Sequence, residues 1–292
     1  MKKISILVVV MSLILLTGCS DATAEISDGS KTLFSVGGEE VTRDDVFKPM
    51  KANAASTVLE EATNLIVKKE IETTDAMRQA ASAELEKAKA TTSGTFKEYI
   101  NGMGFKSEED YYNKYLLLAQ QQKGLYNKYV VDNFDKLAKK LHPVKAQVIY
   151  TTDKDKAVAA LADVIAGKGF VETAQAYGDT KNFSGNVQLI HSSSIGIVDV
   201  LMNRIKTVKK DNTLIKDLIV DATGNGYYIL NVVNTKPADF KDEAINAFLE
   251  LTNTKEDAMA YFLKKYNFVV YDINVYNTIK TNNPAYLVQD QD

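Results

Sequence analysis

The spacing of apolar side chains divides this chain into a long helical stretch, a short mixed stretch and a second helical stretch. From residue 34 to residue 141 the apolar positions recur mostly at three- and four-residue steps, which predicts amphipathic helices. Thr42 precedes Asp45 in the spacing of a capping box, which indicates the start of a helix. The clearest predicted helix begins after Ser107, and Gly124 is expected to weaken or kink it.

The pattern changes at Pro143, because the residue before a proline avoids the α conformation and a helix ends there. Residues 145–150 alternate polar and apolar side chains, with Ala146, Val148 and Tyr150 on one face, as a strand does. Beyond this strand the pattern predicts three helices and a second β-prone run: residues 157–165, 170–177, 195–205 and 227–233. Together these elements predict a small α+β unit.

Helical spacing resumes after Phe240 and continues to about Tyr266. Residues 268–273 alternate as a strand should, and the polar residues 281–292 are expected to form a disordered tail. The predicted fold class is therefore α+β, with a mostly helical body into which a small α+β domain is inserted. The expected boundaries are 34–142 for the first part of the body, 143–237 for the inserted domain and 238–280 for the returning segment.

The first residues read as an export signal. Lys2 and Lys3 precede an apolar run from Ile4 to Leu16, which is too short for the ~20 residues that a membrane-spanning helix needs. The run ends in Leu-Thr-Gly-Cys19, which resembles the lipobox of bacterial lipoproteins. That resemblance implies a signal peptide over 1–18, a lipid on Cys19, a flexible tether over 19–33 and a place on the outer face of the cell membrane.

The composition of the chain excludes several classes of function. The chain carries a formal net charge of −3, so it lacks the basic surface that binds nucleic acid. Cys19 is its only cysteine, which excludes an intrachain disulfide. No metal-ligand spacing, nucleophile elbow or phosphate loop is present, so we expect no metal and no cofactor. The 15 tyrosines and 11 phenylalanines either fill the core or form a surface that binds peptides.

The order of these segments resembles the PrsA-type foldase lipoproteins, which are relatives of SurA-like chaperones. The stretch from Phe34 to Val46 is similar to the opening of that family. Three later stretches are similar to parvulin motifs: residues 144–150, 169–177 and 223–232. The resemblance covers most of the chain after the signal peptide. It implies a helical chaperone body with an inserted parvulin-like peptidyl-prolyl cis–trans isomerase domain.

The parvulin-like stretches depart from the family at the positions that carry its chemistry. Val148 and Tyr228 stand where the family has its two histidines, and Asn186 stands where it has Asp or Cys. Ile197 and Leu201 fall where the family places its proline pocket, and the alternative is that they are plain helix core. Isomerase activity is therefore expected to be weak or absent, while a surface that binds peptides persists.

Both histidines of the chain lie outside these motif positions. His142 and His191 are expected to be solvent-exposed or capping residues without a catalytic role.

The leading hypothesis is a membrane-anchored, extracytoplasmic foldase that assists secreted proteins after translocation. Its partners would be unfolded or partly folded secreted proteins, and a homodimer is left open. One alternative is a solute-binding lipoprotein of a transporter, which would show strand–helix alternation in two lobes. Another is a passive surface or adhesion protein.

Overall fold

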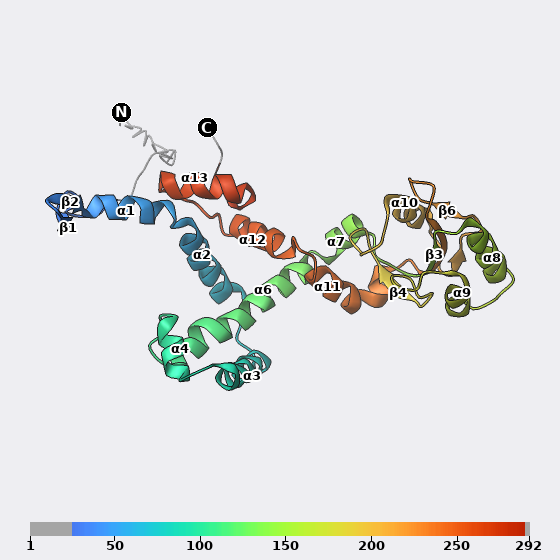
Figure 1. The fold of residues 1–292 in the computed structure, drawn as a ribbon, viewed down its shortest axis with the longest axis horizontal. Coiled ribbons are helices and arrows are strands. Elements are labelled where there is room, and N and C mark those ends of the chain that lie inside the picture. The colour runs from blue at the N-terminus through green and yellow to red at the C-terminus, as the bar shows by residue number, and fades with distance from the viewer. Residues whose placement is uncertain (1–24, 290–292) are drawn as a thin grey trace, which may run out of the picture. The chain divides into compact units, whose positions relative to one another are not determined.

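The structure is a computed structural model that describes residues 25–289, and its contacts divide the chain into two compact units (Figure 1). Among the described residues, unit 1 contains 25–79 and 259–289, and unit 2 contains 80–258. Cys19 and its proposed lipid lie outside the described residues. Within the described part, no helix combines the length and the apolar composition that a membrane crossing requires. The boundaries expected at 142 and 237 remain predictions.

Unit 1 opens with a two-stranded hairpin that leads into a capped helix. Strands β1 (Thr32–Val36) and β2 (Glu39–Thr42) pair antiparallel and are followed by α1 (Arg43–Ala52). Thr42 caps α1 through the predicted capping box: the Asp45 amide donates to the Thr42 hydroxyl, and the Thr42 amide donates to the Asp45 carboxylate. The Thr42 hydroxyl also donates to the Asp45 carboxylate at 2.7 Å, and this bond, together with the bond from the Thr42 amide, lowers the pKa of the Asp45 carboxyl, so it stays charged near the positive end of the helix.

The rest of unit 1 is a small helical cluster that joins the two ends of the chain. Helix α13 (Ile273–Asn282) packs on α1 and on α2 (Ala55–Glu70), and the 3-10 helix η3 (Pro284–Tyr286) packs on α13. The shared core contains Ala55, Val270, Val275, Tyr276 and Ile279. At the other end of α2, the Lys265 ammonium and the Tyr266 hydroxyl both donate to the Glu70 carboxylate.

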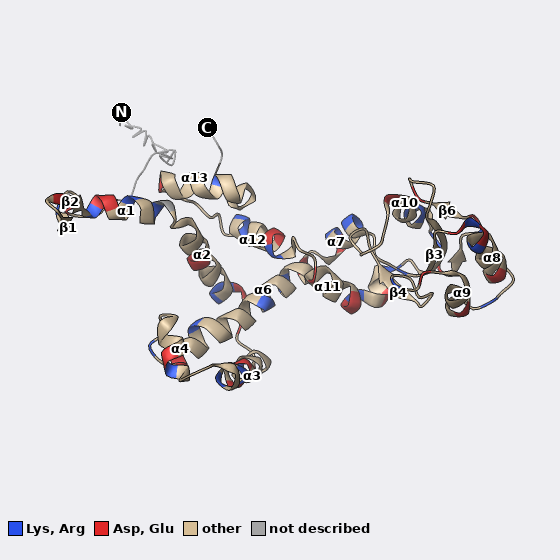
Figure 2. Ribbon diagram, in the orientation of Figure 1, with Lys and Arg blue, Asp and Glu red and all other residues tan. Residues whose placement is uncertain are grey.

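The helical part of unit 2 is built from the end of α3, a series of shorter helices and the returning α11. In chain order these elements are α3 (Asp75–Thr91), α4 (Phe96–Gly102), α5 (Glu108–Tyr111), the π-helix η1 (Tyr112–Leu117), α6 (Leu118–Asp132), α7 (Phe134–Leu141), the 3-10 helix η2 (Pro237–Phe240) and α11 (Lys241–Leu249). Helix α12 (Thr254–Lys265) begins in unit 2 and continues into unit 1. Helix α11 packs on α6, and the Phe248 ring stacks on Phe134 with centroids 6.1 Å apart. The ribbon of α12 carries both acidic and basic residues (Figure 2), with Glu256 and Asp257 in its first turn and Lys264 and Lys265 in its last, as the helix dipole favours.

Between α7 and η2 lies a small antiparallel sheet with helices on both faces. Its strands are β3 (Val144–Thr151), β4 (Gln188–Ile190), β5 (Thr213–Leu214), β6 (Ile219–Val220) and β7 (Tyr227–Asn234), in the order β4-β3-β7-β5, with β6 also paired to β7. Helices α8 (Lys154–Ile165) and α9 (Phe170–Tyr177) cover one face, and α10 (Asp199–Thr207) covers the other. The buried central strands position the candidate site.

The structure corrects four expectations about single elements. The predicted helix over 195–205 begins only at Asp199, because Gly196 takes a left-handed backbone conformation (φ 78°). Gly124 does not interrupt its helix, which instead departs from α geometry in η1 and breaks at Asn133. Residues 268–273 form no strand; the Gln289 side chain hydrogen-bonds to both the amide and the carbonyl of Val270.

The fourth correction concerns the expected tail. Residues 281–289 are not a disordered tail, because α13 extends to Asn282 and η3 follows it. Tyr286 and Leu287 pack against the core of unit 1. Apolar side chains in a mostly polar segment are what hold this end of the chain in place.

Candidate functional site

The two central strands bring the histidine-equivalent positions onto one face of the sheet. In the β3–β7 register Val148 lies opposite Leu230, and Tyr150 lies opposite Tyr228. Because side chains alternate along a strand, Val148 and Tyr228 point to the same side, toward α10. The Tyr228 ring lies 4.8 Å from the Tyr150 ring and 6.2 Å from the Phe183 ring, measured between centroids. We call Tyr150, Phe183 and Tyr228 the aromatic cluster.

The aromatic cluster carries little polar chemistry. Val148 is fully buried and offers neither a donor nor an acceptor. Tyr228 is only 4% exposed, and within the described part of the chain its hydroxyl makes no hydrogen bond. Burial, with smaller contributions from Tyr150 and Asp221, raises the pKa of Tyr228, so the hydroxyl remains protonated at neutral pH. The Tyr228 hydroxyl is thus a neutral donor without a partner among residues 25–289.

The remaining predicted site residues differ in where they lie. Leu201 is fully buried in the same apolar core as Val148 and Tyr228, so it supports the aromatic cluster from within. Ile197 is half-buried at the edge of that core, in the turn before α10. Asn186 is exposed, and its side-chain amide donates to the Ser184 hydroxyl at 2.9 Å. The structure therefore gathers four of the five positions and leaves Asn186 outside their core.

Sequence reasoning missed two residues beside this core. Phe183 lies in the irregular segment between α9 and β4, yet it is 3% exposed and packs edge-on against Tyr228. Ile195, expected inside a helix, is 90% exposed in the turn before α10. A large apolar residue in a polar loop is the signal that could have found Phe183. No pattern in the sequence distinguishes Ile195 from a core residue.

The two histidines also differ from each other. His142 is exposed and ends α7 in a left-handed conformation, in line with the capping role that the sequence predicted. His191, which was expected to be exposed or capping, is 7% exposed and its ring lies 6.0 Å from Phe248. Burial lowers the pKa of His191, which keeps its ring neutral at neutral pH.

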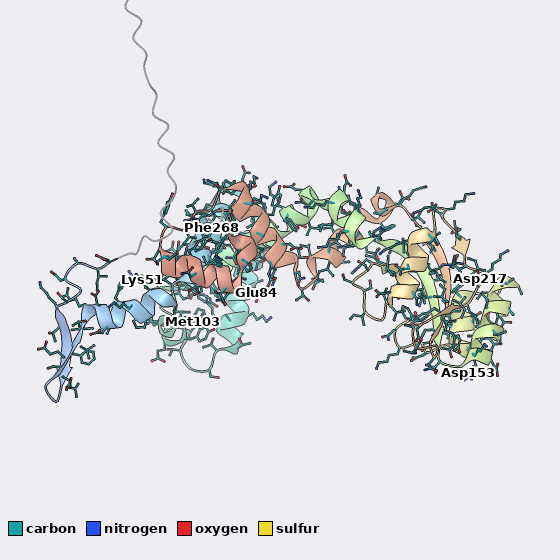
Figure 3. The ribbon with its side chains drawn as sticks, turned by 90° about the horizontal axis from the view of Figure 1, so that it is seen from above. Lys51, Glu84, Met103, Asp153, Asp217 and Phe268 are labelled. Atoms are coloured by element: carbon teal, nitrogen blue, oxygen red, sulfur yellow. The ribbon has the colours of Figure 1, made fainter. Side chains whose placement is uncertain are left out.

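A second apolar surface lies in the helical part of unit 2. Phe96, Phe105 and Tyr111 form a ring cluster, and Tyr111 is buried within it. Around this cluster Tyr99, Met103 and Tyr115 are each more than two-fifths exposed, and Met103 is labelled in Figure 3. Phe248, in contrast, is fully buried against Phe134 and cannot face a ligand.

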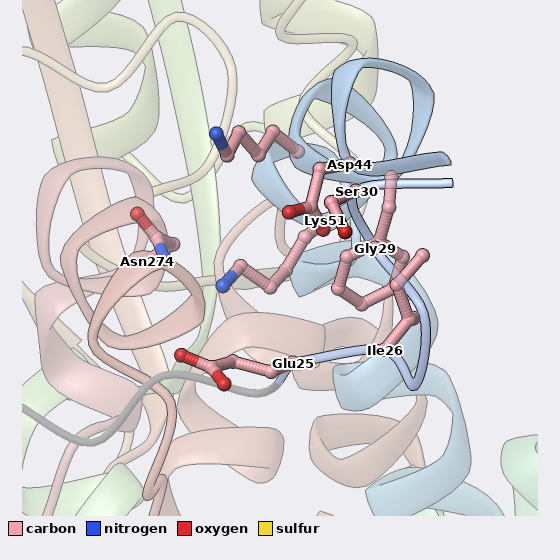
Figure 4. Close-up of a pocket in the computed structure, with 9 residues that line it drawn as sticks. Glu25, Ile26, Gly29, Ser30, Asp44, Lys51 and Asn274 are labelled. Atoms are coloured by element: carbon pink, nitrogen blue, oxygen red, sulfur yellow. The ribbon is translucent and has the colours of Figure 1, made fainter. Parts of the chain in front are cut away.

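A cavity of about 560 Å³ lies in unit 1, between α1, the segment before β1 and α13 (Figure 4). Its lining mixes Glu25 and Asp44 with Lys48, Lys51 and the amide of Asn274. Lys51 is held at 3.6 Å from the Asp272 carboxylate. Opposite charges balance across this cavity, so it favours neither an anion nor a cation.

Comparison with known proteins places the chain beside foldases. No family model matches it. The sequence is 23% identical over 301 residues to foldase protein PrsA 2 of Bacillus cereus, covering 97% of this chain and 98% of that protein. A crystal structure of the peptidylprolyl isomerase PrsA from Bacillus cereus shares the fold with a TM-score of 0.51, at 17% identity over 87% of this chain and 98% of the other.

A crystal structure of foldase protein PrsA from Streptococcus pneumoniae is similar at a TM-score of 0.42, with 15% identity over 88% of this chain and all of the other. The predicted fold class, α+β with a mostly helical body, is confirmed, and so is the resemblance to PrsA-type foldases.

Proposed function

We propose that this chain, which aligns along almost its whole length with a PrsA foldase, is an extracytoplasmic foldase-type chaperone that assists secreted proteins after translocation. The observation that carries the proposal is the combination of that alignment with a shared fold. Exposed aromatic and methionine side chains on the helical part of unit 2 support it, because unfolded chains present the apolar segments that such surfaces bind.

The proposal includes a lipid anchor at Cys19. The motif Leu-Thr-Gly-Cys and the charged and apolar run before it support this anchor. A Cys19→Ser chain should leave the membrane fraction and appear in the medium or the soluble extract. Retention of the variant in the membrane at the wild-type level would argue against the anchor.

We propose further that the parvulin-like domain retains peptide binding and has lost most of its isomerase activity. The packed core around Val148, Leu201 and Tyr228 supports the loss of activity, because it contains one hydroxyl but no linked pair of ring nitrogens. The half-buried Tyr150 and Ile197 at the edge of that core support peptide binding, because they leave apolar surface exposed. Prolyl isomerisation must overcome the ~18–20 kcal/mol barrier to rotation about the amide bond, and this core lacks the two histidines that the parvulin family has at these positions. Strong catalysis of a proline-limited refolding reaction at low enzyme concentration would contradict the proposal.

A homodimer is also part of the proposal. In the β1–β2 hairpin, Leu33, Phe34 and Val36 are each at least half exposed, and a second copy of the chain would cover them. Sedimentation analysis should show a dimer that Phe34→Ser and Val36→Ser together convert to a monomer. A wild-type monomer at micromolar concentration would remove this part of the proposal.

The direct test is suppression of aggregation. Reduced, denatured lysozyme diluted from guanidinium should scatter less light when the mature chain is present at an equal molar amount. A passive surface protein would leave the scattering unchanged. A solute-binding lipoprotein would instead show a large thermal shift with one small molecule, and the antiparallel strand pairing within residues 25–289 gives that alternative no support.

A further inference from the structure

The turn between β4 and α10 is built around His191. The Ser193 amide donates to Nδ1 of His191 at 3.2 Å, and the His191 amide donates to the Ser194 hydroxyl at 2.9 Å. The Ser194 amide donates in turn to the His191 carbonyl at 2.9 Å. These three hydrogen bonds fix residues 191–194 as one compact unit, and the imidazole ring is one of its acceptors.

The same turn continues to the candidate peptide site. The Ile197 amide donates to the Ser194 carbonyl at 3.3 Å, and Gly196 between them has the left-handed φ of 78°. A Cβ at Gly196 would lie only 3.4 Å from the Phe183 ring, so the backbone passes close to the aromatic cluster. Ile195 is left 90% exposed beside that cluster, where it can contact an extended peptide.

At its other end the turn contacts the helices. The His191 ring meets the Phe248 ring of α11 edge-on, at an interplanar angle of 79°. The Ser192 amide donates to the Leu141 carbonyl at the end of α7 at 2.8 Å. Phe248 is fully buried and stacks on Phe134 of α7, so the ring that His191 meets is itself held in place.

We propose that His191 is a positioning residue that holds the turn of Ile195–Ile197 beside the aromatic cluster and couples this turn to helices α7 and α11. The inference rests on the proposed function only in taking the aromatic cluster as a site that binds peptides. It predicts that a change at the His191–Phe248 contact alters peptide binding at the other end of the turn.

The role requires a neutral imidazole. Since Nδ1 accepts a hydrogen bond, the ring proton is assigned to Nε2, and a second proton on Nδ1 would face the Ser193 amide donor. The charged groups nearby are Glu243 and Glu250 of α11, which line a cavity with His191, and Lys145 of β3, which pairs with Glu243. On α7, Lys140 pairs with Asp257 at 3.9 Å. Within the turn itself, the polar side chains other than His191 are those of Ser192, Ser193 and Ser194, and none of them is charged.

Two substitutions separate the two functions of the ring. His191→Phe keeps an aromatic ring against Phe248 and removes the acceptor, whereas His191→Asn keeps an acceptor near the position of Nδ1 and removes the ring. His142→Asn is the matched control, because asparagine tolerates the left-handed conformation of that exposed residue. Amide hydrogen exchange of residues 192–198 is measured in the full mature chain, together with the affinity for a labelled Ala-Leu-Pro-Phe peptide.

In His191→Phe the Ser193 amide should exchange about tenfold faster at pH 7.5, and the peptide should bind several-fold more weakly. His191→Asn should weaken peptide binding while Ser193 stays protected, and His142→Asn should change neither. In the wild type, Ser193 exchange, corrected for the intrinsic pH dependence of exchange, should rise only at a pH lower than the ordinary histidine pKa of about 6.5, because burial lowers the pKa of His191 in the folded chain, and His191→Phe should show no such rise.

Unchanged Ser193 exchange in His191→Phe would overturn the positioning role. Faster exchange with an unchanged peptide affinity in both variants would overturn the coupling to the site. Failure of the wild type to bind the peptide would contradict peptide binding by the parvulin-like domain, and the exchange data would then still decide the role of His191.

Discussion

At the scale of single residues, the sequence named candidate positions but could not give their environments. The motif resemblance assigned Val148 and Tyr228 to the two histidine positions of the family, and the structure shows both in one core. Whether Leu201 lines a pocket or fills a core depends on the packing of α10, which periodicity does not contain. The burial of His191 likewise depends on Phe248, far away in the sequence.

One prediction at this scale concerns Tyr228. Tyr228→Ala removes a buried ring from the aromatic cluster and should destabilise the chain by about 3–5 kcal/mol, the usual cost of truncating a large buried side chain. Tyr228→Phe should cost under about 1 kcal/mol, because the hydroxyl has no partner within the described residues. Urea titrations, followed by exchange protection of β3 and β7, measure both. Equal losses for the two variants would show that the hydroxyl, and not the ring, is what matters.

A second prediction concerns pH. Burial lowers the pKa of His191 in the folded state, so the unfolded chain binds more protons below about 6.5, the ordinary value for histidine. The stability that the neutral ring contributes is therefore complete above that pH and is lost as the pH falls below it. Wild type and His191→Phe should differ in the slope of stability between pH 7 and pH 5. Parallel slopes would mean that His191 does not contribute.

At the scale of elements, local signals predicted the helix starts and the central strands well. The capping box at Thr42, the strand β3 and the helices α8 and α9 follow from patterns within a few residues. The strands β4, β5 and β6 were missed because each has only two or three residues and exists through pairing with β3 or β7. The strand predicted over residues 268–273 was wrong for the opposite reason: the alternating pattern is present, but no neighbouring strand pairs with this segment within the described residues.

An element-scale prediction compares two aspartates labelled in Figure 3. Asp153 caps α8, where its carboxylate accepts from the amides of Asp155 and Lys156 at 2.9 and 3.1 Å. Asp153→Ala should therefore destabilise α8 by ~1 kcal/mol. Asp217→Ala removes only an exposed ion pair with Arg204 and should cost at most a few tenths of a kcal/mol. Exchange protection of the α8 amides measures the effect of Asp153→Ala. This variant must lose clearly more protection in α8 than Asp217→Ala does.

At the scale of the whole molecule, the order of the segments along the chain was the main basis for predicting the architecture. A helical stretch, a mixed stretch and a returning helical stretch indicated a body with an inserted domain. The structure shows that α13 packs on α1 and α2, and that α11 packs on α6. The division into units near residues 79 and 258 was not predicted, because it depends on where contacts are sparse along α3 and α12.

The exposed side chains give a whole-molecule prediction. Met103→Ser and Tyr115→Ser together remove apolar surface around the ring cluster of unit 2 without emptying its core, since both residues are over two-fifths exposed. The double variant should hold denatured lysozyme less well than the wild type in the scattering assay. Val158→Ser, at an equally exposed position on α8, is the matched control and should leave the assay unchanged. An equal loss of aggregation suppression in the double variant and in Val158→Ser would show that the helical part of unit 2 has no special role in binding unfolded chains.

The measurement that tests the account most directly is binding of a permanently unfolded secreted protein. Reduced and carboxymethylated α-lactalbumin, labelled for fluorescence anisotropy, is titrated with the mature chain beside the same protein in its native, disulfide-bonded form. The account predicts saturable binding of the unfolded form and none of the native form. Equal affinity for both forms, or no binding of the unfolded one, would contradict it.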